Sequence, residues 1–146
     1  MKYYQEVIIK NVTFGKIVSS FNNIKIVNFL TQLQPIQIIK WDGIEDGKVA
    51  HFKLWFFGWK DFEVIHSDYY LDENELSFID NGSVLPLGLT FWRHKHSIVI
   101  KKGYVTIIDN LKFNHESSFL GYLLYPLLVS PIFLRKLLYR LYFRGL

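Results

Sequence analysis

The chain has 146 residues and a formal net charge of +4; half of its residues are hydrophobic, 18% are aromatic, and none is cysteine. This length favours a single domain, residues 1–146, that is large enough to bury its own core. The absence of cysteine excludes disulfides, thiolate catalysis and cysteine-ligated zinc. The first residues contain no apolar run of signal-peptide length and no small-residue cleavage site, so we expect a cytoplasmic protein.

The N-terminal part predicts one strand followed by two short helices. Residues 3–12 are rich in β-branched and aromatic side chains, which favour strands. In residues 14–21 apolar side chains recur at helical spacing, and Thr13 is placed to cap this helix. A second helix is predicted from about residue 24 to residue 33, and it ends before Pro35.

The middle of the chain has the pattern of strands joined by short turns. We predict strands over residues 36–41, 48–57, 62–70 and 75–80, with turns at Asp42-Gly43, Asp46-Gly47 and Asn81-Gly82. Residues 83–88 contain Pro86 and are expected to form a loop. With the hairpin described next, this makes seven strands, six of them consecutive, and such a run forms an antiparallel meander.

Residues 89–113 predict two strands joined by a tight turn at Lys102-Gly103, where glycine supplies the positive φ of a short hairpin. If Lys101 faces Tyr104, then His96 faces Asp109. The two-residue period of a strand places ten side chains on one face: Trp92, His94, His96, Ile98, Ile100, Val105, Ile107, Asp109, Leu111 and Phe113. An apolar face thus contains two histidines and one aspartate.

The last thirty residues have a helical pattern. We predict one bent helix from about Ser118; the alternative is a new helix that starts at Ser130-Pro131. Lys136, Arg140 and Arg144 form one polar stripe, and an apolar set lies opposite: Phe133, Leu134, Leu137, Leu138 and Leu141. The apolar run of 16 residues at 119–134 is shorter than the ~20 that a membrane-spanning helix needs, so we interpret it as a buried helix that covers the sheet.

The order of these elements resembles the START-like, or Bet v 1-like, helix-grip fold of the SRPBCC ligand-binding proteins. Bacterial members with a W-x-H-x-H strand are the most similar, and here that strand is Trp92-Arg93-His94-Lys95-His96. Two further segments look like family motifs: Phe78-Ile79-Asp80, and the strand that carries Thr106, Asp109, Leu111 and Phe113. The chain departs from the family pattern in the loop 81–88, which lacks Gly-Pro-Phe, and in the first helix, which lacks the common tryptophan.

The resemblance implies an α+β fold in which a curved, seven-stranded antiparallel sheet grips the long C-terminal helix, with an apolar cavity between them. Members of the family bind lipids, sterols, polyketides or other apolar compounds, and some are cyclases or hydrolases. The family therefore implies a ligand-binding fold but no single activity.

Three interpretations of His94, His96 and Asp109 stay open. The opposed pair His96 and Asp109 is a satisfied polar pair in an apolar wall, or the three side chains anchor the polar group of a ligand, or His96 acts as a base that Asp109 orients. The ligand-binding set that we predict is Trp92, His94, His96, Asp109, Phe78, Leu111 and Phe113.

A metal site is the other chemistry that this spacing allows. His94, His96 and Asp109 could supply three ligands. No fourth ligand can be named, and His51, His66 and His115 lack ligand-like spacing to them. We therefore expect neither a metal nor another cofactor.

We expect an apolar small molecule as the partner, bound without catalysis. The alternatives are an enzyme of the cyclase, dehydratase or hydrolase type and a protein that contacts membrane surfaces weakly through its C-terminal helix. No basic stretch interleaves aromatic residues on one strand face, so nucleic acid is not expected. The sequence leaves open whether the chain forms a homodimer.

Overall fold

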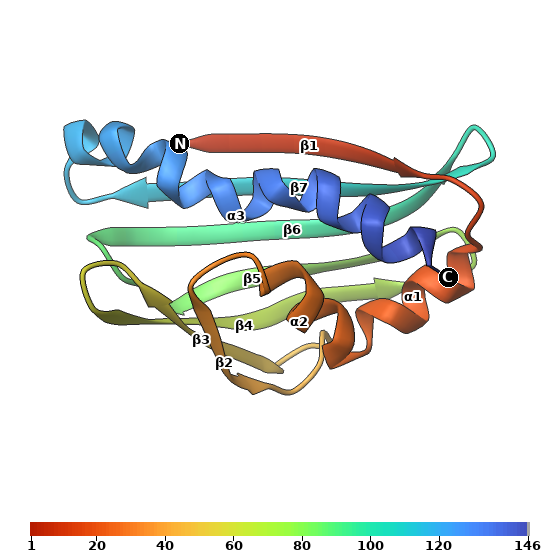
Figure 1. Cartoon of the computed structure of the whole chain (residues 1–146), viewed down its shortest axis with the longest axis horizontal. Helices are drawn as coiled ribbons and strands as arrows, with labels where there is room; N and C mark the ends of the chain where they lie inside the picture. Colours follow the sequence, from red (N-terminus) through yellow and green to blue (C-terminus); the bar gives the residue numbers. More distant parts are fainter. Residues whose placement is uncertain (146) are drawn as a thin grey trace.

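A seven-stranded antiparallel sheet curves around one long helix in the computed structural model of the chain (Figure 1). The structure describes residues 1–145, so the last residue of the predicted C-terminal helix, Leu146, lies outside it. The elements in chain order are β1 (Lys2–Ile9), α1 (Phe14–Phe21), α2 (Ile24–Thr31), β2 (Ile36–Trp41), β3 (Val49–Trp55), β4 (Trp59–Leu71), β5 (Glu75–Val84), β6 (Leu89–Lys101), β7 (Tyr104–His115) and α3 (Ser118–Arg144).

The strand order in the sheet is β1-β7-β6-β5-β4-β3-β2. Strands β2 to β7 are neighbours in sequence and in space, which confirms the predicted meander. Strand β1 pairs with β7, so the first strand of the chain lies beside the last one. In Figure 1, α3 runs along β1, β7 and β6, while α1 and α2 lie toward the other edge of the sheet.

The predicted helix starts are confirmed by their capping hydrogen bonds. The hydroxyl of Thr13 accepts from the backbone N–H of Lys16 at the start of α1, and the amide oxygen of Asn23 accepts from Lys25 at the start of α2. Each cap satisfies a backbone donor that the first helical turn leaves free.

The register predicted for the β6–β7 hairpin is confirmed from Trp92 opposite Phe113 to Lys101 opposite Tyr104. Lys102 and Gly103 both have positive φ, 50° and 80°. Two consecutive positive φ angles are those of a two-residue turn whose twist matches that of the flanking strands. The single-face set of ten residues, with its two histidines and one aspartate, follows from this register.

The turn predicted at Asn81-Gly82 is wrong, because β5 continues through both residues to Val84. Gly82 is required there for space. A Cβ atom on it would lie 2.4 Å from Cδ2 of Leu85 and 3.0 Å from Cβ of Trp92. The chain reverses instead at residues 85–88, where Leu87 and Gly88 have positive φ. Smaller differences occur at other ends: β1 stops at Ile9, α2 stops at Thr31, and β4 starts at Trp59.

Helix α3 is one continuous helix through Pro126 and Pro131, as predicted. Pro131 has no N–H group, so the carbonyl of Leu127 lacks its helical donor. The hydroxyl of Ser130 donates to that carbonyl at 2.9 Å and replaces the missing bond.

The apolar face predicted for the C-terminal half of α3 is only partly buried. Leu138 is 1% exposed, but Phe133, Leu137 and Leu141 are 54%, 55% and 43% exposed. The helix buries a different line of side chains against the sheet: Gly121, Leu128, Val129, Ile132, Leu138, Tyr139 and Phe143. Residues 119–134 are apolar on nearly every side, so periodicity could not select the face that packs on the sheet.

Candidate functional site

Polar side chains from five neighbouring strands and from α3 meet on the concave face of the sheet. Two rows of opposed residues cross the strands. In one row, Asp80 of β5 lies between His66 of β4 and His94 of β6. In the other row, Asp109 of β7 lies between His96 of β6 and Gln5 of β1. We call the set of His66, Asp80, His94, His96 and Asp109 the His/Asp cluster.

Asp109 is fully buried, and neighbours contact both of its oxygens. Oδ1 lies 3.0 Å from Nε2 of His94 and 3.2 Å from Nδ1 of His96, and the former contact has hydrogen-bond geometry. Oδ2 accepts from Nε2 of Gln5 at 2.8 Å, while a guanidinium nitrogen of Arg135 lies 3.9 Å from Oδ1. Burial alone would raise the pKa of Asp109, but the interactions with His94 and His96 outweigh it and hold the pKa below its usual range.

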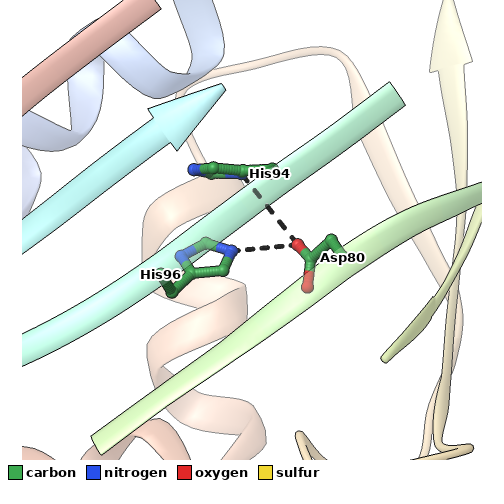
Figure 2. A group of neighbouring side chains, drawn as sticks. All are labelled: Asp80, His94 and His96. Carbon is green, nitrogen blue, oxygen red and sulfur yellow. Dashed lines mark hydrogen bonds and ion pairs between the residues drawn. The ribbon is translucent and has the colours of Figure 1, made fainter. Parts of the chain in front are cut away.

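Asp80 lies on β5 beside both imidazoles of β6, with one oxygen directed at them (Figure 2), and it lines the cavity described below. Nε2 of His96 donates to its Oδ2 at 2.9 Å, and Nδ1 of His94 lies 4.0 Å from the same oxygen. Nδ1 of His66 lies 2.8 Å from Oδ1, without the alignment of a hydrogen bond. Burial would raise the pKa of Asp80. The charge of His96 and the contacts with His96 and His66 outweigh burial and lower this pKa well below its usual range.

His94 and His96 have opposite pKa shifts although their ring centroids are only 3.9 Å apart. Burial and the nearby positive charge of His96 lower the pKa of His94 to about 4, against the opposing effect of Asp109. Burial also acts to lower the pKa of His96, but the charge of Asp80 and the contacts with Asp80 and Asp109 raise it. His94 is therefore neutral at pH 7, and of the two rings His96 is the one whose protonated form is favoured.

The hydrogen bond to Asp109 also sets the tautomer of neutral His94. Because Nε2 donates to the carboxylate, Nδ1 carries the free lone pair and faces Asp80. A neutral imidazole with a free lone pair can accept a hydrogen bond or bind a metal.

His66 is the least satisfied member of the cluster. Its side chain is 4% exposed, and no residue among 1–145 forms a hydrogen bond with its Nε2. A buried polar atom without a partner costs about 1–3 kcal/mol, so such an atom is retained where water or a ligand can reach it.

A cavity of about 270 Å³ lies between the concave face of the sheet, α2 and α3. Its wall is mainly apolar and aromatic, with side chains that include Ile26, Leu30, Ala50, Phe52, Phe62, Val64, Phe78, Trp92, Leu128 and Ile132. Polar side chains in the wall are His66, Asp80, His94, His96 and Arg135 at the His/Asp cluster, and Thr31, Gln34 and Ser130 from α2, the segment after it and α3. A mainly apolar cavity with a few polar groups is typical of a small-molecule site.

Four of the seven predicted ligand-binding residues line this cavity: Phe78, Trp92, His94 and His96. The other three, Asp109, Leu111 and Phe113, do not line it and have no exposed surface. They belong to β7, which lies under α3, whereas the cavity lies over β3 to β6. Phe113, for example, stacks on Tyr125 of α3 with ring centroids 5.8 Å apart.

Sequence analysis missed the roles of His66, Asp80, Gln5 and Arg135 in this region. Asp80 was within reach of a sequence argument, because in an antiparallel pair the register of β5 on β6 places it opposite His94. The turn wrongly predicted at Asn81-Gly82 hid that pairing. His66 precedes an irregular segment of β4 in which Asp68 has a φ of 52°, so no simple alternation predicts its face.

No model of a known protein family matches the sequence, and no curated protein matches it. Solved structures do match. Norcoclaurine synthase from Thalictrum flavum has a TM-score of 0.66 at 13% identity, with 99% of this chain and 94% of that chain covered. Ara h 8.0201 has a TM-score of 0.54 at 15% identity, covering 100% and 99%. The STAR-related lipid transfer protein from Xanthomonas axonopodis has a TM-score of 0.54 at 14% identity, covering 98% and 85%.

The chain has the Bet v 1-like, or START-like, helix-grip fold. At 13–15% identity this likeness shows the fold alone. It confirms the predicted fold class. The function of this chain has to be argued from its own cavity and His/Asp cluster.

Proposed function

We propose that this protein binds a small, mostly apolar molecule that carries one polar group. The observation that carries the proposal is the cavity of about 270 Å³, whose wall is mainly apolar and includes a polar patch of side chains from the His/Asp cluster. This volume is just below the ~300–1,000 Å³ typical of ligand pockets, so a compact ligand fits better than a long lipid chain.

His94 and His96 are the predicted polar anchors that line the cavity, and Asp109 supports them from behind. Asp80 and His66 extend the polar patch, and the free Nε2 of His66 offers an unused hydrogen-bonding atom. A hydroxyl, carbonyl or carboxylate oxygen on the ligand would satisfy these groups. Specificity would follow because a ligand without that oxygen leaves buried polar atoms unpaired.

The first test is to identify molecules that purify with the protein. We expect native mass spectrometry of protein from its own host to detect a bound apolar compound, which solvent extraction then releases. Recovery of only ligand-free protein would count against the proposal.

The second test measures the polar patch with two matched probes, naphthol and naphthalene. We expect calorimetry to show tighter binding of naphthol, because only naphthol has a hydroxyl. His66→Phe keeps the ring volume but removes the nitrogens, so the preference for naphthol should fall about tenfold, or about 1.4 kcal/mol. Equal affinities of the wild-type protein for both probes would contradict the role of the polar patch.

Ala50→Phe and Ile39→Phe provide a matched pair for the cavity itself. Ala50 is 3% exposed and lines the cavity, whereas Ile39 is 50% exposed on β2 and does not line it. A phenyl ring at residue 50 should fill the cavity and weaken naphthol binding at least tenfold, while Ile39→Phe should bind like the wild type. Equal binding by both variants would place the probe outside this cavity.

The acid–base alternative uses His96 as the base and Asp109 as its orienting group. It has less support, because Asp80 and Asp109 both favour the protonated form of His96. A protonated imidazole cannot take up a proton, although it can act as an acid. Turnover of a carbonyl substrate that His96→Ala abolishes in a folded protein would favour this alternative.

A second candidate function is contact with an anionic membrane surface. Eight large apolar side chains of α3 are exposed: Phe119, Leu120, Tyr122, Leu123, Leu127, Phe133, Leu137 and Leu141. Helix α3 is long and apolar enough to cross a membrane by length and composition, which is also true of some core helices, but only 22% of its most apolar window is buried. The opposite placement predicted for the basic stripe is wrong, since Nζ of Lys136 lies 5.1 Å from the ring centre of Phe133. Lys136, Arg140 and Arg144 therefore lie beside the exposed apolar side chains and would attract anionic lipid.

Vesicle sedimentation tests this candidate. We expect the full chain to sediment with vesicles of equal parts phosphatidylcholine and phosphatidylglycerol, and a triple Leu123→Ser, Leu137→Ser, Leu141→Ser variant to remain in solution. Ile39→Ser is the control, since Ile39 is similarly exposed on the sheet. Dimer formation without vesicles, lost in the triple variant, would assign the face to a homodimer instead.

A further inference from the structure

We propose that Asp80, His94 and His96 bind a divalent transition-metal ion on the wall of the cavity. Oδ2 of Asp80 lies 2.9 Å from Nε2 of His96 and 4.0 Å from Nδ1 of His94. All three ligand atoms lie within 4.8 Å of one another, on two adjacent strands (Figure 2). Ligands about 2.1 Å from a tetrahedral metal are roughly 3.4 Å apart, so small side-chain shifts bring these atoms to coordination distance.

Asp109 already orients both imidazoles for this role. Its Oδ1 lies 3.0 Å from Nε2 of His94 and 3.2 Å from Nδ1 of His96. Each ring therefore directs its other nitrogen toward Asp80. Metal-binding histidines generally place their second ring nitrogen on a carboxylate or carbonyl, which fixes the ring and makes it a better ligand.

Gln5 and Arg135 contact Asp109 in turn. The side chain of Gln5 donates to Oδ2 of Asp109 and to the carbonyl of Ile132, each at 2.8 Å, and so ties β7 to α3. Arg135 lies 3.9 Å from Oδ1 of Asp109. A metal binds only neutral imidazoles, so the ion would displace the proton that His96 favours. With both rings neutral, the two carboxylates and one guanidinium leave one negative charge in this region for the cation to balance.

His66 gives independent support for a ligand at this position. Its Nδ1 lies 2.8 Å from Oδ1 of Asp80, the oxygen that does not face His94 and His96. Its Nε2 has no hydrogen-bond partner among residues 1–145, and its side chain lines the cavity. His66 thus contacts the outer oxygen of Asp80 and leaves Nε2 available to a metal-bound water or to the ligand.

The donor set indicates the class of metal. Two imidazoles and one carboxylate with open positions suit Fe²⁺, Zn²⁺ or Co²⁺, whereas Mg²⁺ and Ca²⁺ prefer oxygen ligands. Asp80, His94 and His96 all line the cavity, so the open positions face it. If the proposed binding function also holds, the polar group of the ligand is an oxygen group that coordinates metals, such as a carboxylate or a catecholate.

The test is a titration of Co²⁺ into the full chain after dialysis against EDTA. We expect one Co²⁺ per chain, visible d–d absorption bands, and displacement by Zn²⁺. His94→Ala and His96→Ala should each weaken Co²⁺ binding at least 100-fold, and Asp109→Asn, which alters the support, should weaken it by about 10–100-fold. Equal Co²⁺ affinities for wild type and His94→Ala would overturn the proposal.

His51→Ala is the matched control. His51 lies 2.8 Å from Asp61 and 3.8 Å from Glu63, but its side chain is 25% exposed on β3, outside the His/Asp cluster. Its removal should leave the Co²⁺ affinity unchanged. Loss of the bound ion in His51→Ala alone would place it at that surface group and overturn the assignment.

X-ray absorption of the Zn²⁺-loaded wild type keeps the proposal falsifiable if a variant fails to fold. Scattering from two imidazoles at about 2.0–2.1 Å is expected, and fewer than two would overturn the site. Naphthol binding in EDTA separates the two proposals. If the protein binds naphthol but not Co²⁺, the metal proposal is wrong and the proposed binding function stands. If it binds Co²⁺ but not naphthol, the metal proposal stands and the proposed binding function is wrong.

Discussion

Asp80 and Asp109 are both carboxylates that contact histidines on the concave face of the sheet, yet their surroundings differ. Asp109 has no exposed surface, accepts from Gln5 and His94, and does not line the cavity. Asp80 keeps 16% of its side chain exposed and forms part of the cavity wall. The difference separates a carboxylate that holds the fold together from one that a ligand can reach.

The largest expected effect is on Asp109. Asp109→Asn removes a buried charge that faces His96 and Arg135, and we expect it to lower the free energy of unfolding by about 3–5 kcal/mol. Asp80→Asn should lower it by less than half as much and should instead weaken ligand binding. Urea unfolding of both variants measures this difference, and equal losses of stability would remove the distinction between the two carboxylates.

The next largest effect is a change of stability with pH that depends on His94, which lies 4.0 Å from Asp80 and 3.0 Å from Asp109. The pKa of His94 is about 4 in the folded state and about 6.5 in the unfolded state. As pH falls, His94 is therefore protonated in the unfolded state before it is protonated in the folded state. Stability should therefore fall as pH drops from 6.5 to about 4, by about 3 kcal/mol at most. His96 has the opposite sign, since its raised pKa contributes stability that is lost as pH rises through the folded value.

His94→Asn separates these contributions. In metal-free protein, urea unfolding between pH 6.5 and pH 4 should show a shallower loss of stability in the variant than in the wild type. The carboxylates Asp80 and Asp109 titrate below this window, because the folded state lowers their pKa values. Parallel curves for the two proteins would show that His94 is not held neutral.

A smaller effect is expected at Gln5, which donates to Asp109 and to the carbonyl of Ile132. Gln5→Leu leaves Oδ2 of Asp109 without its donor and should lower the free energy of unfolding by about 1–3 kcal/mol. Because Gln5 is remote from Asp80, naphthol affinity should stay at the wild-type value. Gln37→Leu on the exposed side of β2 is the control and should be neutral in the same urea experiment. A large loss of naphthol binding in Gln5→Leu would show that the two carboxylates are not independent.

The smallest effect concerns Gly82, two residues after Asp80. Gly82→Ala places a Cβ atom 2.4 Å from Leu85 and 3.0 Å from Trp92, and this overpacking should cost about 1 kcal/mol. Gly15→Ala is the control, since nothing lies within 4 Å of the added atom and helical alanine is favourable. Thermal unfolding compares the two, and a neutral Gly82→Ala would mean that Leu85 moves aside freely.

The hairpin that carries His94, His96 and Asp109 was predictable to the residue, because a two-residue turn and strict alternation determine both register and face. The element order was predictable for the same reason: turns, caps and apolar periods are local properties of the chain. Those signals were sufficient to predict the fold class and to place two of the three proposed metal ligands, His94 and His96, on one face.

The positions of Asp80, His66 and Arg135 depend on contacts between residues that are far apart in the sequence. Asp80 reaches His96 because β5 continues along β6 past residue 80, and His66 reaches Asp80 across the irregular pairing of β4 with β5. Arg135 points inward because α3, apolar on nearly all sides, is oriented by its packing on β1 and β7. Local patterns depend on neighbours within a few residues, whereas these positions depend on which surfaces bury together once the sheet has closed around the helix.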